Sequence, residues 1–143
     1  MRALTLCFVF ALLVLATPVH ADQVTVNGIT LHYSAMPSVR LTPEVARQYG
    51  LTRSASRALL NLALRRDDAG VDVAVPARIT ASATNENGQR QELRLREVRE
   101  GDAIYYLAEV RISDREVLNF EINADVGGRP LQASFRQQFF VDR

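Results

Sequence analysis

The alternation of apolar and polar side chains constrains the fold of this chain more than any other feature. From residue 60 onward, apolar residues recur at every second position, most clearly in residues 103–112 and 131–141. Side chains of a β-strand point alternately to its two faces, so a period of two predicts strands that each bury one face. Seven strands are expected, over residues 24–35, 60–64, 71–84, 93–98, 103–112, 118–124 and 131–141.

Turn residues separate these strands at short intervals. Asn27-Gly28 favours a turn inside the first of them, so residues 24–35 are either one strand or a short hairpin. Pro76 lies in the middle of another and has no N–H to donate to a ladder, which predicts an edge position or a bulge. About seven short strands of this kind predict an all-β fold, an immunoglobulin-like antiparallel β-sandwich, with a closed barrel as the alternative.

One segment breaks the alternation and carries the signals of a helix. Thr42 can cap the N-terminus through its side-chain oxygen, and Pro43 follows where a missing N–H costs nothing. Glu44 complements the positive end of the helix dipole, and Gly50 is a natural C-terminal stop. The sequence therefore predicts one short helix of about two turns between residues 42 and 50.

Residues 1–21 have the composition of a cleavable signal peptide. A basic residue precedes an apolar run, and the small residues Val19 and Ala21 stand at the third-last and last positions before the expected cut. The run is shorter than the roughly 20 residues that a membrane-spanning helix needs. Cys7 lies inside the run, whereas a lipid anchor needs a cysteine at the cut. We therefore expect a periplasmic protein, with residues 22–143 as a single domain and no stable membrane anchor.

The residue inventory excludes several classes of function. Residues 22–143 contain no cysteine and a single histidine, so disulfides, thiol catalysis and cysteine-based metal sites are excluded, and no cofactor is expected. All 17 basic residues of the chain are arginine, and without Arg2 they balance the 16 acidic residues. A chain without net charge has no field that steers it to nucleic acid or to an anionic membrane, so neither is expected as a partner.

The other chemistry-bearing residues form no catalytic pattern. His32 is expected on a solvent-facing strand face, and no serine stands in a Gly-x-Ser-x-Gly setting. Asp67, Asp68 and Asp72 surround a turn, but their spacing lacks the pattern of a calcium loop, which favours a solvated turn. We therefore expect no catalytic residues, no metal ligands and no enzymatic activity.

A series of arginines flanks the predicted helix and the strand after it, and these residues can form an edge that binds an anion or a partner. The alternative is that they form ion pairs with nearby acidic residues such as Asp67 and Asp68. The arginines are Arg47, Arg53, Arg57, Arg65 and Arg66. Tyr49, Tyr105 and Leu107 are anchor candidates if they are exposed, or ordinary cover over the core if they are not. The predicted interaction surface consists of Arg47, Tyr49, Arg53, Arg57 and Tyr105.

Several short strings, taken in order, resemble one known family. They are Leu41-Thr-Pro-Glu-Val-Ala-Arg-Gln-Tyr-Gly-Leu51, Arg57-Ala-Leu-Leu-Asn-Leu62, Ala83-Thr-Asn85, Arg99-Glu-Gly-Asp-Ala-Ile-Tyr-Tyr106 and Phe135-Arg-Gln-Gln-Phe139. Together they resemble a proteobacterial family of small exported proteins, the domain of unknown function 4426. The resemblance implies an immunoglobulin-like sandwich and export, and it brings no activity and no catalytic residues with it.

Three hypotheses for function remain at this point. The first is a non-catalytic periplasmic interaction module, which contacts a partner protein through the helix-bearing connection or an exposed edge strand. The second is a binder of a small ligand, which needs a pocket in the folded protein. The third is a carboxylate-based hydrolase, which needs two acidic groups that converge in a cleft.

Overall fold

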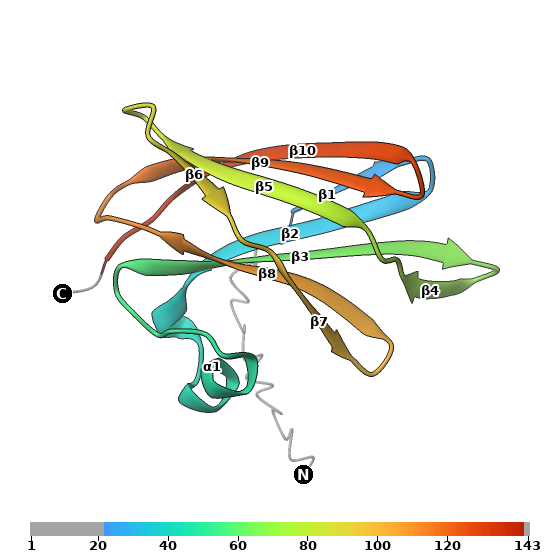
Figure 1. Ribbon diagram of the computed structural model, residues 1–143, viewed down its shortest axis with the longest axis horizontal. Coiled ribbons are helices and arrows are strands. Elements are labelled where there is room, and N and C mark those ends of the chain that lie inside the picture. The colour runs from blue at the N-terminus through green and yellow to red at the C-terminus, as the bar shows by residue number, and fades with distance from the viewer. Residues whose placement is uncertain (1–21, 142–143) are drawn as a thin grey trace, which may run out of the picture.

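The computed structural model describes residues 22–141, which form two stacked antiparallel β-sheets and one short α-helix (Figure 1). The predicted all-β sandwich is confirmed, and the two sheets have separate ladders, so the fold is not a closed barrel. The predicted signal peptide lies outside the described residues. No helix within residues 22–141 is both long enough and apolar enough to cross a membrane.

Six strands form the first sheet and four form the second, and all pairs are antiparallel. The first sheet runs in the order β1 (Asp22–Val26), β2 (Ile29–Pro37), β3 (Arg57–Asp68), β8 (Ala103–Arg111) and β7 (Arg96–Glu100). A short strand, β4 (Val71–Ala74), pairs with the second half of β3. The second sheet runs in the order β10 (Arg129–Gln138), β9 (Val117–Val126), β5 (Arg78–Asn85) and β6 (Arg90–Leu93).

The ten observed strands correspond to the seven that alternation predicts, because three of the seven are each divided in two. Asn27 and Gly28 both have positive φ, 51° and 78°, and form the tight turn of the β1–β2 hairpin. Near Pro76 the chain leaves the first sheet after β4 and enters the second as β5. At Arg94-Leu95 it returns from β6 in the second sheet to β7 in the first.

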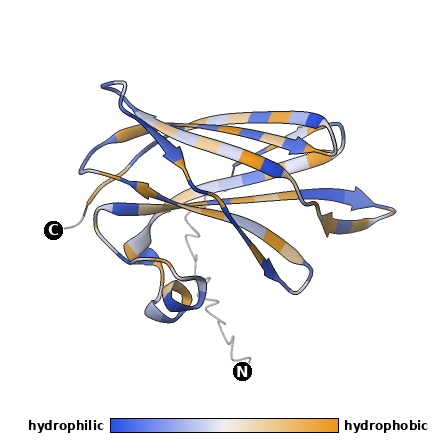
Figure 2. Ribbon diagram, viewed as in Figure 1, coloured by the Kyte–Doolittle hydropathy of each residue, from blue (hydrophilic) through white to orange (hydrophobic). Residues whose placement is uncertain are grey.

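The core lies between the sheets and is built from side chains at alternate strand positions. Buried and exposed residues alternate along β9, and Figure 2 shows the matching alternation of hydropathy on the ribbon. Leu60, Leu62 and Leu64 of β3 are completely buried, as the period of two predicts. Burial of a leucine side chain contributes about 1.5–3 kcal/mol relative to exposure, so this core holds the sheets together without covalent links.

Stacked aromatic rings close one side of the sandwich, where β10 lies against β2. Tyr33 of β2 stacks on Phe135 of β10 with ring centroids 4.8 Å apart, and Phe135 stacks on Phe120 of β9 at 4.6 Å. Phe139 makes an edge contact with Phe120 at 6.2 Å. We call these four residues the closed seam, because their rings fill the gap between the sheets along this side.

The predicted helix is confirmed as α1 (Pro43–Tyr49). Thr42 caps it by accepting a hydrogen bond from the backbone N–H of Val45 at 3.2 Å, and Gly50 ends it in the left-handed conformation with φ of 63°. A single 3-10 turn, η1 (Ser38–Arg40), precedes the helix. Figure 1 places α1 beside the first sheet, close to the ends of β2 and β3.

Side-chain contacts fix α1 to the edge strand β7. Arg96 of β7 donates a hydrogen bond to the backbone carbonyl of Tyr49, and the Tyr49 hydroxyl donates to the carboxylate of Glu100. Ala46 of the helix is 4% exposed although it lies outside the core between the sheets. The helix therefore lies against the edge strand β7 of the first sheet.

Candidate functional site

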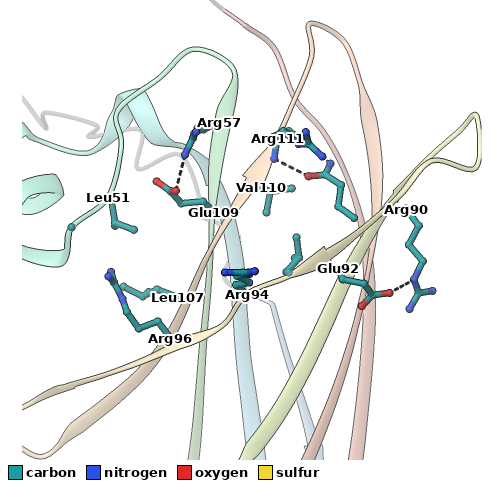
Figure 3. Close-up of a pocket in the computed structure, with 13 residues that line it drawn as sticks. Leu51, Arg57, Arg90, Glu92, Arg94, Arg96, Leu107, Glu109, Val110 and Arg111 are labelled. Carbon is teal, nitrogen blue, oxygen red and sulfur yellow. Dashed lines mark hydrogen bonds and ion pairs between the residues drawn. The ribbon is translucent and has the colours of Figure 1, made fainter.

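A groove lies on the side of the sandwich opposite the closed seam, and none of the described residues that line it is aromatic. β7 pairs with β8 only as far as Leu107, whereas β8 continues to Arg111. The chain preceding β7 has crossed to the second sheet, where it forms β6. A groove of about 590 Å³ occupies the space between β6, the end of β8 and the Gly50-Leu51 segment after α1 (Figure 3).

Arginine dominates the lining of this groove, which we call the arginine groove. Five lining residues are arginines and two are glutamates, which gives an excess of three positive charges. The arginines come from separate parts of the chain: Arg57 from β3, Arg90, Arg94 and Arg96 from the β6–β7 segment, and Arg111 from β8. The chain as a whole carries a net charge of only +1, so this concentration of charge is local.

Strand register explains why these arginines converge. Arg57 and Arg111 are direct partners across β3 and β8, so their side chains share one face of the first sheet. Arg96 is the partner of Leu107. Leu107 lies on the same face as Arg111 because the two are four positions apart along the strand, an even number. This is the outer face, since Val110, with the opposite orientation, is 1% exposed within the core.

Both glutamates of the arginine groove are held in ion pairs. Glu109 accepts from the guanidinium of Arg57 at 2.8 Å and from the backbone N–H of Thr52 at 2.7 Å. Glu92 accepts from Arg90 at 2.6 Å, and this hydrogen bond raises the pKa of Arg90 above its ordinary value. The negative charge of the groove is therefore already matched by two of its five arginines.

The other three arginines supply the excess positive charge. Arg96 donates to the carbonyl of Tyr49, which is neutral, so its charge stays uncompensated. The guanidinium groups of Arg94 and Arg111 make no hydrogen bond or ion pair with any side chain or carbonyl of residues 22–141; Arg111 is held by its backbone alone. Figure 3 shows Arg94 central among the lining residues.

A glutamine side chain joins the two sheets at one end of the groove. The amide of Gln91 in β6 donates to the backbone carbonyl of Arg111 at 2.9 Å and accepts from the backbone N–H of the same residue at 3.0 Å. A second glutamine joins the sheets at the closed seam, where Gln137 of β10 donates to the carbonyl of Ala35 in β2 at 2.9 Å.

The structure separates the residues of the predicted interaction surface. Arg57 lines the groove, but Arg47 lies on the exposed side of α1, 3.8 Å from Glu44. Arg53 donates to the carbonyls of Leu41 and Val39 at 2.7 and 3.1 Å, which ties the segment before β3 to the segment before α1. Arg53 therefore has a structural contact of its own.

The two tyrosines of that predicted surface lie in different places. The hydrogen bond from Tyr49 to Glu100 raises the pKa of the Tyr49 hydroxyl above its ordinary value of 10.0, and it fixes the ring against β7. Tyr105 lies with His32 and Asn61 around a separate shallow depression on the outer face of the first sheet. Neither tyrosine lines the arginine groove.

The aspartates near residue 70 are occupied by local contacts. Asp67 accepts from the backbone N–H of Gly70 at 2.7 Å, and Asp72 pairs with Arg65 at 2.7 Å, which matches the ion-pair alternative for that arginine. Across residues 22–141, no three histidine, cysteine or acidic side chains are grouped so that they could hold a metal ion.

Sequence reasoning missed four of the five groove arginines, Arg90, Arg94, Arg96 and Arg111. The only signal was that Arg94 and Arg96 alternate with Leu93 and Leu95 in a predicted strand. That pattern assigns them to a polar face but does not say which other residues share it. The crossover at Arg94-Leu95, which brings β6 near the end of β8, carries no proline or glycine in the sequence.

Fold and site together define a class: a small antiparallel β-sandwich with an arginine-lined groove at one open side. Comparison with known proteins gives the family. The model of the family described as "Domain of unknown function (DUF4426)" matches residues 23–142. This chain belongs to the DUF4426 family, as the resemblance in its sequence strings implied.

Solved structures agree with this assignment. A DUF4426 family protein from Pseudomonas aeruginosa PAO1 is 32% identical, with a TM-score of 0.72 over 85% of this chain and 96% of that one. FetP of uropathogenic Escherichia coli strain F11, recombinantly expressed in the periplasm of E. coli BL21(DE3), shares the fold with 13% identity and a TM-score of 0.62 over 86% and 95% of the two chains. A copper-bound variant of FetP gives 16% identity and a TM-score of 0.60, over 83% and 94%. No curated protein is significantly similar to the chain.

Proposed function

We propose that this protein is an exported, non-catalytic binding module of the periplasm, and that it binds a carboxylate-bearing partner protein in the arginine groove. The observation that carries the proposal is the surplus of arginine in the groove. Five arginines converge there from three parts of the fold, and only two of them are matched by glutamates.

Guanidinium chemistry favours a carboxylate as the bound group. The planar fork of arginine matches the two oxygens of a carboxylate and can bind both at once. The guanidinium groups of Arg94 and Arg111 have no partner among the described residues, so they can take a ligand group without breaking an existing ion pair. Both arginines are exposed, so each ion pair with a ligand carboxylate contributes up to about 1 kcal/mol, and affinity comes from several such contacts made together.

Both carboxylates of the groove are already paired with arginines, which favours binding over acid–base catalysis. Glu109 and Glu92 are both held by arginines at 2.8 and 2.6 Å. A carboxylate-based hydrolase needs two acidic groups free to act on a substrate between them. The groove instead presents fixed positive charge, which suits recognition of an anion.

Copper binding, which is described for FetP, is not the function that the residues of this chain favour. Copper sites use imidazole and thioether ligands, and residues 22–141 contain one of each, His32 and Met36. Both lie on β2, four residues apart. At about 3.3 Å per residue, their positions are separated by about 13 Å, too far to share one ion.

A small anionic ligand is the second candidate for the groove. Its volume of about 590 Å³ lies within the range of roughly 300–1,000 Å³ that is usual for small-molecule sites. A free di- or tricarboxylate would use the same arginines as a partner protein. The two candidates differ in the size of the molecule that binds, which an experiment can separate.

The test compares removal of charge inside and outside the groove. The first variant is Arg94→Gln/Arg111→Gln. The matched control is Arg78→Gln/Arg129→Gln, which removes two exposed arginines from the second sheet at positions that do not line the groove. Fluorescence anisotropy of a labelled hexaglutamate peptide gives the affinity of each protein, with citrate as a competitor.

We expect the groove variant to bind the peptide about tenfold more weakly than the control, because it loses two exposed ion pairs that are each worth up to about 1 kcal/mol. Equal affinity of both variants, or no binding by the unmodified protein, would overturn the proposal. Competition by citrate at concentrations matched in carboxylate would favour the small-ligand candidate over a protein partner.

A further inference from the structure

The last part of β8, at the arginine groove, has a strand partner on one side only. β8 pairs with β3 along residues 106–111, but its other side pairs with β7 only along residues 103–107. Beyond Leu107 the neighbouring chain has crossed to the second sheet. The last part of β8 therefore has one open side, and this side faces the groove.

The direction of the backbone groups along β8 follows from three contacts. Ile112 donates its N–H to the carbonyl of Ser56 at 3.0 Å, so even-numbered positions point toward β3. The two-residue turn between Glu100 and Ala103 points odd-numbered positions toward β7. Arg111, also odd, exchanges both of its backbone hydrogen bonds with the side chain of Gln91.

Glu109 is the odd position left between these two partners. Leu107 is paired with Arg96, and Arg111 is satisfied by Gln91. The backbone N–H and C=O of Glu109 point the same way, yet Glu109 lies outside the β7–β8 ladder and makes no backbone hydrogen bond with a loop residue in the described part of the chain. An unpaired donor and acceptor at a sheet edge form a template for one more strand.

We propose that the arginine groove binds an extended acidic peptide segment of a partner protein, which adds a short strand to β8 at Glu109. One residue of the peptide exchanges two backbone hydrogen bonds with Glu109, in the mode known as β-augmentation. Carboxylates on the peptide then contact Arg94 and Arg111. This inference rests on the proposed function, since it assigns the geometry of the same anion site.

The excess positive charge of the groove favours an acidic peptide as its occupant. The side chain of Glu109 does not oppose such a peptide, because Arg57 and the Thr52 N–H already hold its two oxygens. Arg111 and Arg96 lie on the outer face of the sheet, on either side of Glu109 along the strand direction. In an added strand, alternate side chains share that face, so acidic residues at every second position meet the arginines.

The experiment separates backbone pairing from charge. The probe is a labelled peptide, Ac-Glu-Val-Glu-Val-Glu-amide, and the matched control is the same peptide with every backbone nitrogen of its valines and glutamates methylated. Methylation removes the backbone donors and leaves every carboxylate in place. Anisotropy measures both affinities against the unmodified protein and the Arg94→Gln/Arg111→Gln variant.

A second readout follows the hydrogen exchange of individual amides by NMR. In the free protein we expect the amide of Glu109 to exchange quickly, while Val110, which points to β3, is protected. Saturation with the unmethylated peptide should slow exchange at Glu109 at least about tenfold, because the amide is then hydrogen-bonded in a ladder.

The outcomes distinguish the two proposals. Strand addition predicts that methylation weakens binding at least about tenfold, with protection of Glu109 by the unmethylated peptide only. If both peptides bind equally and both lose affinity with the arginine variant, charge alone explains binding; strand addition is then wrong and the proposed function stands. If neither peptide binds and hexaglutamate does not bind either, both proposals are wrong.

Discussion

The two sides of the sandwich, where one sheet meets the other, are built in contrasting ways. At the closed seam, aromatic rings from both sheets stack at 4.6–4.8 Å, and Phe120 and Phe139 are almost completely buried. At the arginine groove, the corresponding gap is lined by charged side chains and stays open. Each side has a glutamine that bridges the sheets, Gln137 at the seam and Gln91 at the groove. Both sides have a glutamine bridge, but aromatic rings fill the gap at the closed seam and charged side chains line it at the arginine groove.

This contrast separates stability from recognition. Aromatic burial at the closed seam contributes free energy of folding, whereas like charges at the groove repel one another and contribute none. A groove that is costly for the isolated protein and open to solvent has the character of a binding site. The following predictions test whether stability and binding are divided between the two sides in this way.

The largest effect is expected from truncation at the closed seam. Phe120→Ala removes a completely buried ring that stacks on Phe135 and makes an edge contact with Phe139, so the variant leaves a cavity and loses both contacts. We expect the free energy of unfolding to fall by about 3–5 kcal/mol, measured by urea denaturation at neutral pH. A loss below about 1 kcal/mol would mean that this side does not hold the sheets together. The matched control is Phe140→Ala, because the ring of Phe140 is 60% exposed.

A moderate effect is expected from removal of the glutamine bridge at the groove. Gln91→Ala leaves the backbone N–H and C=O of Arg111 without their protein partners. Because both groups lie at the surface, where water can replace the amide, we expect a loss of about 1–2 kcal/mol in urea denaturation. Gln132→Ala, on an exposed position of β10, is the control and should change stability by less than about 0.5 kcal/mol. Equal losses in the two variants would contradict a bridging role.

A small effect on stability is expected when the groove arginines are removed. A large loss of stability would contradict the comparison of the two sides. Arg94→Ala and Arg111→Ala remove guanidinium groups that have no partner among the described residues. We expect the free energy of unfolding to change by less than about 0.5 kcal/mol, with a gain at low ionic strength, where repulsion is least screened. A loss of 2 kcal/mol or more, on the scale of about one buried charge-assisted bond, would show that these arginines serve the fold instead.

The smallest effect is a pH dependence at the contact between α1 and β7. The pKa of Tyr49 is raised in the folded state by its hydrogen bond to Glu100, so folded protein holds this proton more tightly than unfolded protein. The resulting stability is fully present below pH 10 and is lost as the pH rises through the folded-state pKa. We expect the difference in urea midpoint between wild type and Tyr49→Phe to shrink above pH 10. In a Glu100→Gln background, this pH dependence of the difference should be reduced.

Much of the fold follows from local sequence patterns. The strand from Val117 shows the period of two without interruption, and the capping signals at Thr42 and Gly50 place the helix correctly. Pro76 marks a real discontinuity, although the structure makes it a crossover between sheets, where the sequence predicts an edge or a bulge. Local chemistry decides these features, and local chemistry can be read from one sequence.

The candidate site depends on long-range pairing, which a single sequence does not reveal. Arg57 and Arg111 meet because β3 pairs with β8, and Arg94 joins them because the chain crosses between sheets at Leu95. Sequence proximity pointed instead to arginines around the helix, of which Arg53 is tied to backbone carbonyls. Of the predicted surface, only Arg57 lines the groove, because it is the cross-strand partner of Arg111, whereas Tyr105 lies farther along β8.

The most direct test of the account is a map of where an acidic probe binds on the unmodified protein. Hexaglutamate is titrated into isotope-labelled protein, and the shift of every backbone amide is followed by NMR. We predict saturable shifts confined to β6, the end of β8 and residues 50–51, with β2 and β10 unchanged. Shifts spread over the exposed arginines of both sheets, such as Arg66, Arg78 and Arg129, would contradict the claim that the groove is the binding site.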